Sequence, residues 1–247
     1  MAASKSECPS STGSKSAEVT LGEQIGKGSY GEVYKAKWRG KTVAAKRIHS
    51  IFFERDYDED IRNHYIAEFR KEWVVLSKLD HPHIVKMHTV VFPNRCSPII
   101  ITELLSCDLE SFIKQSQTEP RVQWNDLIKI SLGISKGLNY LHSQKSPIVH
   151  RDLATKNVLL TESRKAKIAD LGVAKVFTKD NMSATAVPGT PFYCAPETWP
   201  SRQGMSYEEQ AEYGVKADIF SFGVVLLAMI VGREPVVWPL SPISKGN

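Results

Sequence analysis

Five runs along the chain combine apolar residues with strand-forming ones, and the first three are separated only by short turns. Such runs predict β-strands, and Arg39-Gly40 suits the tight turn between the second and third of them. The runs lie at residues 19–25, 32–38, 41–48, 85–92 and 99–104. Because short turns favour antiparallel neighbours, the sequence predicts an antiparallel sheet for the first three runs.

Elsewhere the apolar residues recur every three or four positions, which predicts amphipathic helices. The first stripe consists of Ile66, Phe69, Trp73, Leu76 and Leu79. The second consists of Leu127, Ile130, Ile134, Leu138 and Leu141, with Asn125 or Asp126 as its predicted cap. A continuous apolar run at 218–231 is too short to span a bilayer and predicts a buried helix.

The order of these elements predicts how the chain is organised. Residues 1–17 are rich in Ser and Lys and lack periodicity, which predicts a disordered tail. The pattern then changes from strand-rich to helix-rich near residue 105. We therefore expect an N-terminal part at 18–105 and a mainly helical part at 106–247.

Composition narrows the class of protein. The chain has 247 residues, a net charge of +5 with basic residues spread along it, and four cysteines without a CxxC spacing. We therefore expect no nucleic-acid partner, and free thiols in a reducing compartment. The N-terminus lacks the apolar core of a signal peptide, so we expect a cytoplasmic protein without stable membrane insertion. The sequence leaves the oligomeric state open.

A glycine-rich segment, Gly26-x-Gly28-x-x-Gly31-x-Val33, separates the first two predicted strands. Glycines let backbone N–H groups approach a phosphate closely, although a purely structural turn would explain the same pattern. A dinucleotide-binding fold needs a helix directly after the glycines. Here a strand follows, which argues against that fold.

A second polar segment, His150-Arg151-Asp152-Leu153-Ala154-Thr155-Lys156-Asn157, lies between the second helical stripe and a short apolar run at 158–160. Asp170-Leu171-Gly172 begins 13 residues after Asn157. Acids, cations and an amide therefore fall close together in loops anchored by packed elements. Taken singly, each could be a turn-capping side chain.

Taken together, these segments carry a family resemblance. The glycine-rich loop, Val-Ala-Ala-Lys ending at Lys46, His-Arg-Asp with Asn157, Asp-Leu-Gly at 170–172 and Ala195-Pro196-Glu197 occur in that order. Over residues 19–235 the chain thus resembles the eukaryotic protein kinases. The resemblance implies an α+β fold of two lobes: a five-stranded antiparallel sheet with one helix, then a mainly helical lobe, with ATP between them.

The resemblance also implies roles for individual residues. Lys46 would hold the α- and β-phosphates of ATP, and Asp152 would accept the proton of the substrate hydroxyl. Asp170 would bind Mg²⁺, and Asn157 would bind a second Mg²⁺ ion. The family's ion pair between a strand lysine and a helix glutamate would join Lys46 to Glu72, with Glu68 as the rival partner.

The nucleotide site implied by the resemblance draws on residues from several elements. Thr102 would guard the back of the adenine pocket, while Glu103 and Leu105 would offer backbone hydrogen bonds to adenine. The remaining contacts would come from the glycine-rich loop and from apolar residues on either side of the ring: Ile25, Gly26, Lys27, Gly28, Ser29, Gly31, Val33, Ala44 and Leu159.

Two features conflict over which hydroxyl accepts the phosphate. Ala154 and Lys156 make the catalytic loop similar to that of tyrosine kinases. In contrast, Gly189-Thr190-Pro191-Phe192-Tyr193-Cys194-Ala195-Pro196-Glu197 is similar to the serine/threonine version, with Tyr193 where tyrosine kinases have Trp. The mixture resembles the tyrosine-kinase-like group, most of whose members act on Ser and Thr. We expect a protein kinase that phosphorylates Ser or Thr of protein substrates, with Tyr as the alternative.

Two departures from the family pattern affect this expectation. Leu171 stands where the family usually has Phe, and because it is also apolar we expect Asp170 to keep its role. After the apolar run at 218–231 the sequence has about 15 residues more, so the resemblance implies an incomplete C-terminal lobe. The rival hypothesis is therefore a kinase-like module that binds nucleotide or a partner with little turnover.

Overall fold

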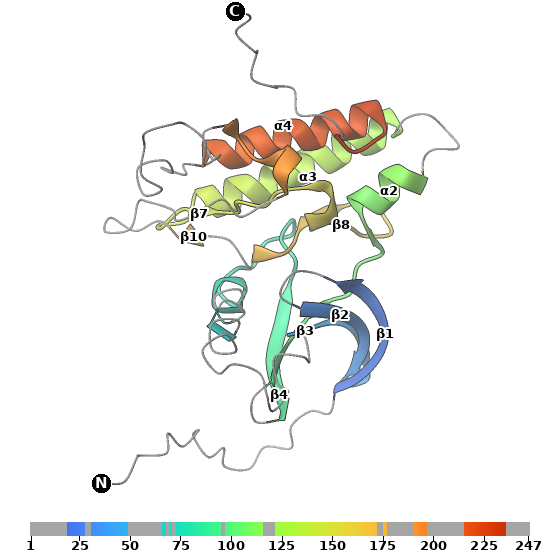
Figure 1. Ribbon diagram of the computed structural model, residues 1–247, viewed down its shortest axis with the longest axis vertical. Coiled ribbons are helices and arrows are strands. Elements are labelled where there is room, and N and C mark those ends of the chain that lie inside the picture. Colours follow the sequence, from blue (N-terminus) through green and yellow to red (C-terminus); the bar gives the residue numbers. More distant parts are fainter. Residues whose placement is uncertain are drawn as a thin grey trace, which may run out of the picture.

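A computed structural model describes the central elements of the chain. The described residues are 19–27, 31–48, 66–67, 70, 73–94, 97–115, 122–171, 175–176, 190–196 and 215–235. Within them a β-sheet occupies one part of the molecule and two long helices occupy the other (Figure 1). This arrangement confirms the predicted α+β fold. The predicted tail at 1–17 lies outside the described residues, and the division near residue 105 stays a prediction.

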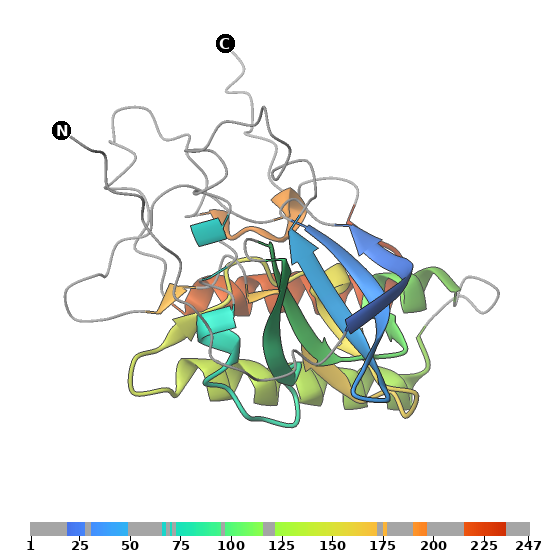
Figure 2. The same cartoon turned by 90° about the horizontal axis from the view of Figure 1, so that it is seen from below.

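The sheet has five strands in the order β1-β2-β3-β5-β4. They are β1 (Val19–Lys27), β2 (Gly31–Trp38), β3 (Lys41–Ile48), β4 (Met87–Asn94) and β5 (Ser97–Glu103). Every neighbouring pair is antiparallel, which the short turns predicted for β1, β2 and β3 and the family resemblance for the sheet as a whole. Seen from below, the strands lie in front of the helices (Figure 2).

The turn between β2 and β3 has the predicted two-residue form. Trp38 pairs with Lys41, and the two residues between them, Arg39 and Gly40, have φ angles of 49° and 76°. Positive φ at both central positions defines the turn whose twist matches that of an antiparallel hairpin. The sequence Arg-Gly therefore fixes the register between β2 and β3.

The two faces of the sheet pack against different partners. One face buries an apolar cluster of Ala36, Val43, Ala45, Ile99 and Ile101. On the other face, Ile48 and Ile100 pack against Ile66 and Trp73 from the first helical stripe. The predicted helix is helical at residues 66–67, 70 and 73–76. Its other residues before 76 lie outside the described residues.

The second part of the molecule is built on α2 (Leu109–Gln115), α3 (Trp124–His142) and α4 (Lys216–Val231). The predicted stripe on α3 is buried throughout, because all five of its apolar residues face the core. The predicted cap is wrong: Gln123 precedes the first turn and makes no side-chain cap hydrogen bond. Asn125 and Asp126 instead lie inside the helix.

Short strands connect the helices to the sheet. One small sheet joins β6 (Cys107–Asp108), β8 (Val158–Leu160) and β9 (Ala166–Ile168). Another joins β7 (Ile148–Val149) to β10 (Lys175–Val176). Strands of two or three residues leave no readable period, so the sequence predicted none of them as strands and marked 158–160 only as an apolar run.

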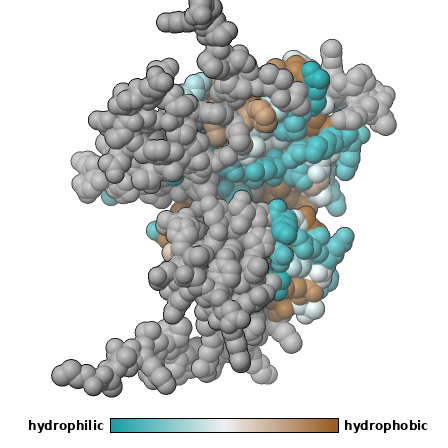
Figure 3. Space-filling view, viewed as in Figure 1, coloured by the Kyte–Doolittle hydropathy of each residue, from teal (hydrophilic) through white to brown (hydrophobic). Residues whose placement is uncertain are grey.

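Parts of α3 and α4 keep large apolar side chains at the surface. Trp124 and Leu132 on α3 and Leu227 and Ile230 on α4 are exposed, and apolar residues reach the surface in the part of Figure 3 where α4 lies. Over the described residues, no helix combines the length and apolar character that crossing a bilayer needs.

Candidate active site

Strand pairing brings the first group of predicted residues onto one face of the sheet. Gly26 pairs with Val33, and Val33 pairs with Lys46. Directly paired residues on neighbouring strands project from the same face, as do residues two apart on one strand. Ala44, which pairs with Thr102, therefore shares this face with Lys46. The row runs from the glycine-rich segment to the end of β5.

The apolar residues predicted to contact adenine are not fully buried. Val33, Ala44, Leu105 and Leu159 are half-buried, and Ile25 is 48% exposed. Ordinary core residues of this chain, such as Ala45 beside Ala44, are completely buried. The partial exposure leaves apolar surface that a planar ring can cover.

Glu103 joins the end of β5 to the β8–β9 hairpin. Its carboxylate oxygen Oε1 accepts hydrogen bonds from the backbone N–H of Lys86 at 2.7 Å and from Nζ of Lys167 at 2.5 Å. Its own backbone N–H donates to the carbonyl oxygen of Lys86. These bonds fix the start of the segment that leads to Leu105.

Lys46 and Asp170 meet across 124 residues of sequence. Nζ of Lys46 donates a hydrogen bond to Oδ1 of Asp170 at 2.9 Å. The lysine side chain is 17% exposed and the aspartate side chain 47% exposed. The contact connects β3 directly to the loop after β9, so the two predicted residues belong to one site.

The backbone around Asp170 is held from both sides. Asp170 adopts a left-handed conformation with φ 59°, which is uncommon for a residue other than glycine. Before it, the Ala169 N–H donates to the Asn157 carbonyl oxygen at 2.9 Å, and the Ala169 carbonyl accepts Nε2–H of His150 at 2.8 Å. After it, Leu171 is buried in the core. Packed neighbours can therefore maintain the uncommon conformation.

The carboxylate of Asp152 is held by three other residues. Nδ2 of Asn157 donates to Oδ2 at 3.0 Å and to the Asp152 carbonyl at 2.7 Å. The backbone N–H and the hydroxyl of Thr190 both donate to Oδ1, at 2.7 and 2.9 Å. Nζ of Lys156 lies 3.9 Å from Oδ2. Such donors fix the direction of the carboxylate.

Asp218, near the start of α4, supports the loop that carries Asp152. Its carboxylate accepts the backbone N–H groups of His150 and Arg151 at 2.9 and 3.0 Å, and Nε2–H of His142 at 2.7 Å. The residue is completely buried. A buried carboxylate needs such donors, so Asp218 braces the backbone of the loop just before Asp152.

The donor set suits a magnesium ion held together with phosphates. Asp170 supplies a partly exposed carboxylate, and Asn157 uses its amide nitrogen on Asp152, which directs the amide oxygen elsewhere. Mg²⁺ prefers such oxygen ligands and needs only one or two from the protein when phosphates supply the rest. Among the described residues, no group of three or more His, Cys, Asp or Glu forms a metal cage by itself. The residues therefore fit the predicted ion.

Part of the predicted site lies outside the described residues. Gly28 and Ser29 of the glycine-rich loop belong to this part, as do Glu72 and its rival Glu68. The ion pair between Lys46 and a helix glutamate therefore stays a prediction. Glu197 also lies outside, although Ala195 before it is described and buried.

Sequence reasoning did not assign Thr190 or Glu234 to the site. Thr190 lies in the motif at 189–197, so its position was available, but the motif alone does not say that its hydroxyl reaches Asp152. Glu234, past the end of α4, contacts the catalytic loop at Thr155. No spacing in the sequence indicates that contact, which depends on how α4 packs.

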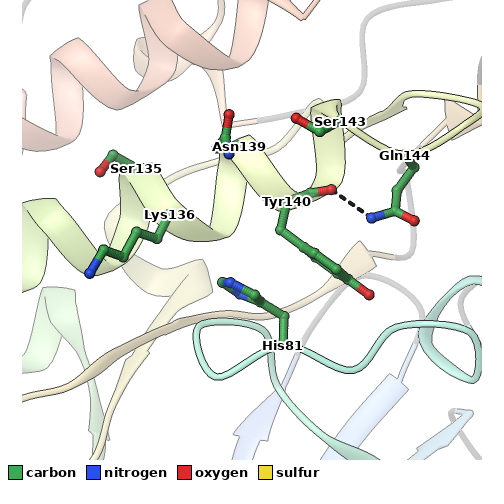
Figure 4. Close-up of a pocket in the computed structure, with 7 residues that line it drawn as sticks. All are labelled: His81, Ser135, Lys136, Asn139, Tyr140, Ser143 and Gln144. Atoms are coloured by element: carbon green, nitrogen blue, oxygen red, sulfur yellow. Dashed lines mark hydrogen bonds between the residues drawn. The ribbon is translucent and has the colours of Figure 1, made fainter.

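A pocket of about 650 Å³ lies apart from these residues, beside α3. Lys136 and Tyr140 line it together with His81, whose ring stacks on that of Tyr140 at 4.6 Å between centroids (Figure 4). None of the residues that line it belongs to the predicted nucleotide site.

Comparison with known proteins gives one consistent family. The family model described as "Protein kinase domain" matches residues 19–239. The chain is 37% identical over 222 residues to R826 of Acanthamoeba polyphaga mimivirus, whose name gives it provisionally as a serine/threonine-protein kinase/receptor. It is 33% identical to "Serine/threonine-protein kinase CTR1" of Arabidopsis thaliana over 220 residues, and also to "Probable serine/threonine-protein kinase drkD" of Dictyostelium discoideum over 223 residues.

These matches cover most of this chain but a minor part of the relatives. They span 88–89% of the chain, yet only 12% of the mimivirus protein, 24% of CTR1 and 15% of drkD. The similarity therefore concerns one segment of each larger protein.

Proposed function

We propose that this chain, which belongs to the protein kinase family, transfers the γ-phosphate of ATP to serine or threonine hydroxyls of protein substrates. The observation that carries this proposal is the contact of Lys46 with Asp170 at 2.9 Å. This contact joins a strand lysine to a loop aspartate, the two residues that the family's motifs assign to the phosphates and to the metal, across 124 residues of sequence. The relatives named as serine/threonine kinases support the choice of acceptor.

Each described residue has a task that its geometry supports. The ammonium group of Lys46 neutralises phosphate charge, and the half-buried apolar residues Val33 and Ala44 cover the adenine ring. Asp170 and Asn157 would hold Mg²⁺, which would offset the negative charge of the phosphates. These assignments follow the motifs residue by residue.

Asp152 orients the attacking hydroxyl. In the transfer, the bond between the γ-phosphorus and the β–γ bridging oxygen breaks, and a bond from the substrate oxygen to the same phosphorus forms. The hydroxyl proton passes to the Asp152 carboxylate and then to solvent. The hydrogen bonds from Asn157 and Thr190 keep the carboxylate in one orientation before substrate arrives.

The Thr190 contact also bears on acceptor specificity. Thr190 lies in the motif that resembles the serine/threonine kinases, and it contacts Asp152 directly. The two residues that resemble tyrosine kinases, Ala154 and Lys156, leave this Thr190 contact in place. Ala154 is buried, and Nζ of Lys156 lies at the edge of the same carboxylate. We therefore propose Ser and Thr, rather than Tyr, as the phosphate acceptors. The mixture of features also places the chain, in this proposal, in the tyrosine-kinase-like group.

The test is transfer of labelled γ-phosphate from MgATP to a mixed protein substrate, followed by identification of the phosphorylated amino acid. The proposal predicts labelled phosphoserine or phosphothreonine, and loss of the label in Asp152→Asn. Phosphotyrosine alone would overturn the acceptor assignment. ATP binding with equal, background-level labelling in both proteins would favour the non-catalytic module.

A further inference from the structure

Glu234 reaches the catalytic loop because α4 ends in a specific turn. Gly232, directly after α4, has a left-handed φ of 74°, and its N–H donates to the Ala228 carbonyl at 2.9 Å. Glycine adopts this conformation without steric cost and thereby ends the helix. The turn directs the next residues back along the helix end, where Glu234 meets Thr155.

The Glu234 carboxylate binds two hydroxyl groups from separate segments. Oγ1 of Thr155 donates to Oε1 at 2.7 Å, and the phenol of Tyr193 donates to Oε2. The two hydroxyl oxygens lie 3.1 Å apart, so the one carboxylate holds the two hydroxyls side by side. Thr155 is 1% exposed and Tyr193 is 3% exposed.

Burial makes this network costly to disrupt. Burial, followed by the hydrogen bond to Glu234, raises the pKa of Tyr193 far above its ordinary value of 10, so the phenol stays protonated and donates. Hydrogen bonds to a carboxylate are stronger than those between neutral groups. If the carboxylate is removed, one hydroxyl can donate to the other across 3.1 Å, and the second buried hydroxyl loses its acceptor.

The two hydroxyls belong to the segments that hold Asp152. Thr155 lies in the 3₁₀ turn Thr155–Asn157, whose last residue donates to the Asp152 carboxylate. Tyr193 ends the turn Pro191–Tyr193, directly after Thr190, which donates to the other carboxylate oxygen. Glu234 therefore joins the two groups of donors that surround Asp152.

The other end of α4 holds the residues just before Asp152. Asp218 accepts the backbone N–H groups of His150 and Arg151, and Ser221, one turn further, donates to the Tyr193 carbonyl at 2.7 Å. The catalytic loop is thus anchored on both sides of Asp152, by Asp218 of α4 before it and by Glu234, just past the end of α4, after it.

We propose that Glu234 is a positioning residue for phosphoryl transfer, which fixes the catalytic loop and the 190–196 segment in register around Asp152. The inference rests on the proposed kinase function. Its contacts lie on the Asp152 side of the site, whereas Lys46 and Asp170 serve the nucleotide. Loss of Glu234 therefore lowers kcat and leaves the KM for ATP nearly unchanged.

The experiment compares Glu234→Ala, Glu234→Gln and Thr155→Val with the unchanged chain. Glu162→Gln, at an exposed turn, is the matched control. For each variant, kcat is measured per nucleotide-binding site, counted by titration, so that a misfolded fraction does not count. Amide hydrogen exchange over residues 150–158 is measured on the same samples.

We expect Glu234→Ala to lower kcat roughly tenfold or more, with the KM for ATP within about twofold. Glu234→Gln keeps an acceptor for one hydroxyl, so its kcat falls less than that of Glu234→Ala. Because Glu234 acts through Thr155, combining Glu234→Ala with Thr155→Val costs less than the product of the two single effects. Exchange over 150–158 accelerates in Glu234→Ala and not in Glu162→Gln.

A kcat for Glu234→Ala within about twofold of the unchanged chain would overturn the inference, even if exchange accelerates, because the role would then be structural only. If instead the unchanged chain phosphorylates no better than Asp152→Asn, the proposed function itself fails. In that case amide hydrogen exchange over residues 150–158 still tests whether Glu234 anchors the loop. Unchanged exchange in Glu234→Ala would refute the anchoring, and accelerated exchange would support it.

Discussion

Thr190 donates two hydrogen bonds to one oxygen of Asp152, from its backbone N–H at 2.7 Å and from its hydroxyl at 2.9 Å. The other oxygen receives the amide of Asn157. A carboxylate bonded on both oxygens has little freedom to rotate, which is what a group that must meet a substrate hydroxyl requires. The contact therefore links the 190–196 segment to the proposed chemistry.

The hydroxyl of Thr190 can be removed while the backbone bond remains. We expect Thr190→Val to lower kcat about tenfold, since a hydrogen bond to a charged group is lost. Thr190→Ser keeps the hydroxyl and should stay within about threefold of the unchanged chain. Steady-state phosphorylation of a protein substrate measures both, and equal rates for Val and Ser would contradict this role of the hydroxyl.

Asp170 should determine how the protein responds to magnesium. In Asp170→Asn the charged ligand is lost, so we expect at least about tenfold more Mg²⁺ to be needed for half-maximal activity, and removal of divalent ions by a chelator to abolish activity. A magnesium titration of activity at fixed ATP makes the measurement. An unchanged magnesium requirement would place the ion elsewhere.

Asp218 should contribute strongly to stability. Asp218→Ala removes the acceptor of two buried backbone N–H groups and of His142, so we expect a loss of about 3–5 kcal/mol in the free energy of unfolding. Asp80→Ala is the control, because its exposed pair with Lys86 is worth less than about 1 kcal/mol. Urea denaturation compares them, and similar losses would argue against the brace.

His81 should make stability depend on pH. Burial, and then the positive charge of nearby His83, Lys165 and Lys136, lower the pKa of His81 below its ordinary 6.5. Its Nδ1 also accepts the backbone N–H of His83 at 3.2 Å, which disfavours protonation of that nitrogen. The unfolded chain therefore binds a proton near pH 6.5 that the folded chain binds only at lower pH.

Stability consequently falls as the pH drops below about 6.5, with a slope from this group of at most about 1.4 kcal/mol per pH unit. His81→Phe keeps an aromatic ring against Tyr140 and removes the titration, so its free energy of unfolding should fall less between pH 7.5 and 5.5. Parallel pH profiles for the two proteins would show that His81 does not contribute.

Local pattern was sufficient for much of the fold. The stripe from Leu127 to Leu141 predicted the buried face of α3, and Arg39-Gly40 predicted a turn whose two positive φ angles are observed. The ends of elements were less predictable, because β1 continues to Lys27 through residues without alternation. The predicted cap of α3 was wrong because the helix begins after Gln123, a poor capping residue, and not after Asn125 or Asp126.

Contacts between the candidate site residues were predictable where motifs carry them. Lys46, Asp152, Asn157 and Asp170 were identified by their order in the sequence, and the structure brings Lys46 to Asp170 and Asn157 to Asp152. The network of Glu234 was not predictable. It depends on the left-handed turn at Gly232 and on side chains from three segments, and neither leaves a periodic signal in the sequence.

The central claim is that residues far apart in sequence form one site for ATP and a substrate hydroxyl. The most direct test measures both MgATP binding and phosphate transfer on the same samples of the unchanged chain and of Asp152→Asn. The account predicts dissociation constants for MgATP within about threefold of each other, with transfer reduced by about 10²–10⁴-fold in the variant. Equal transfer rates in the two proteins would contradict it.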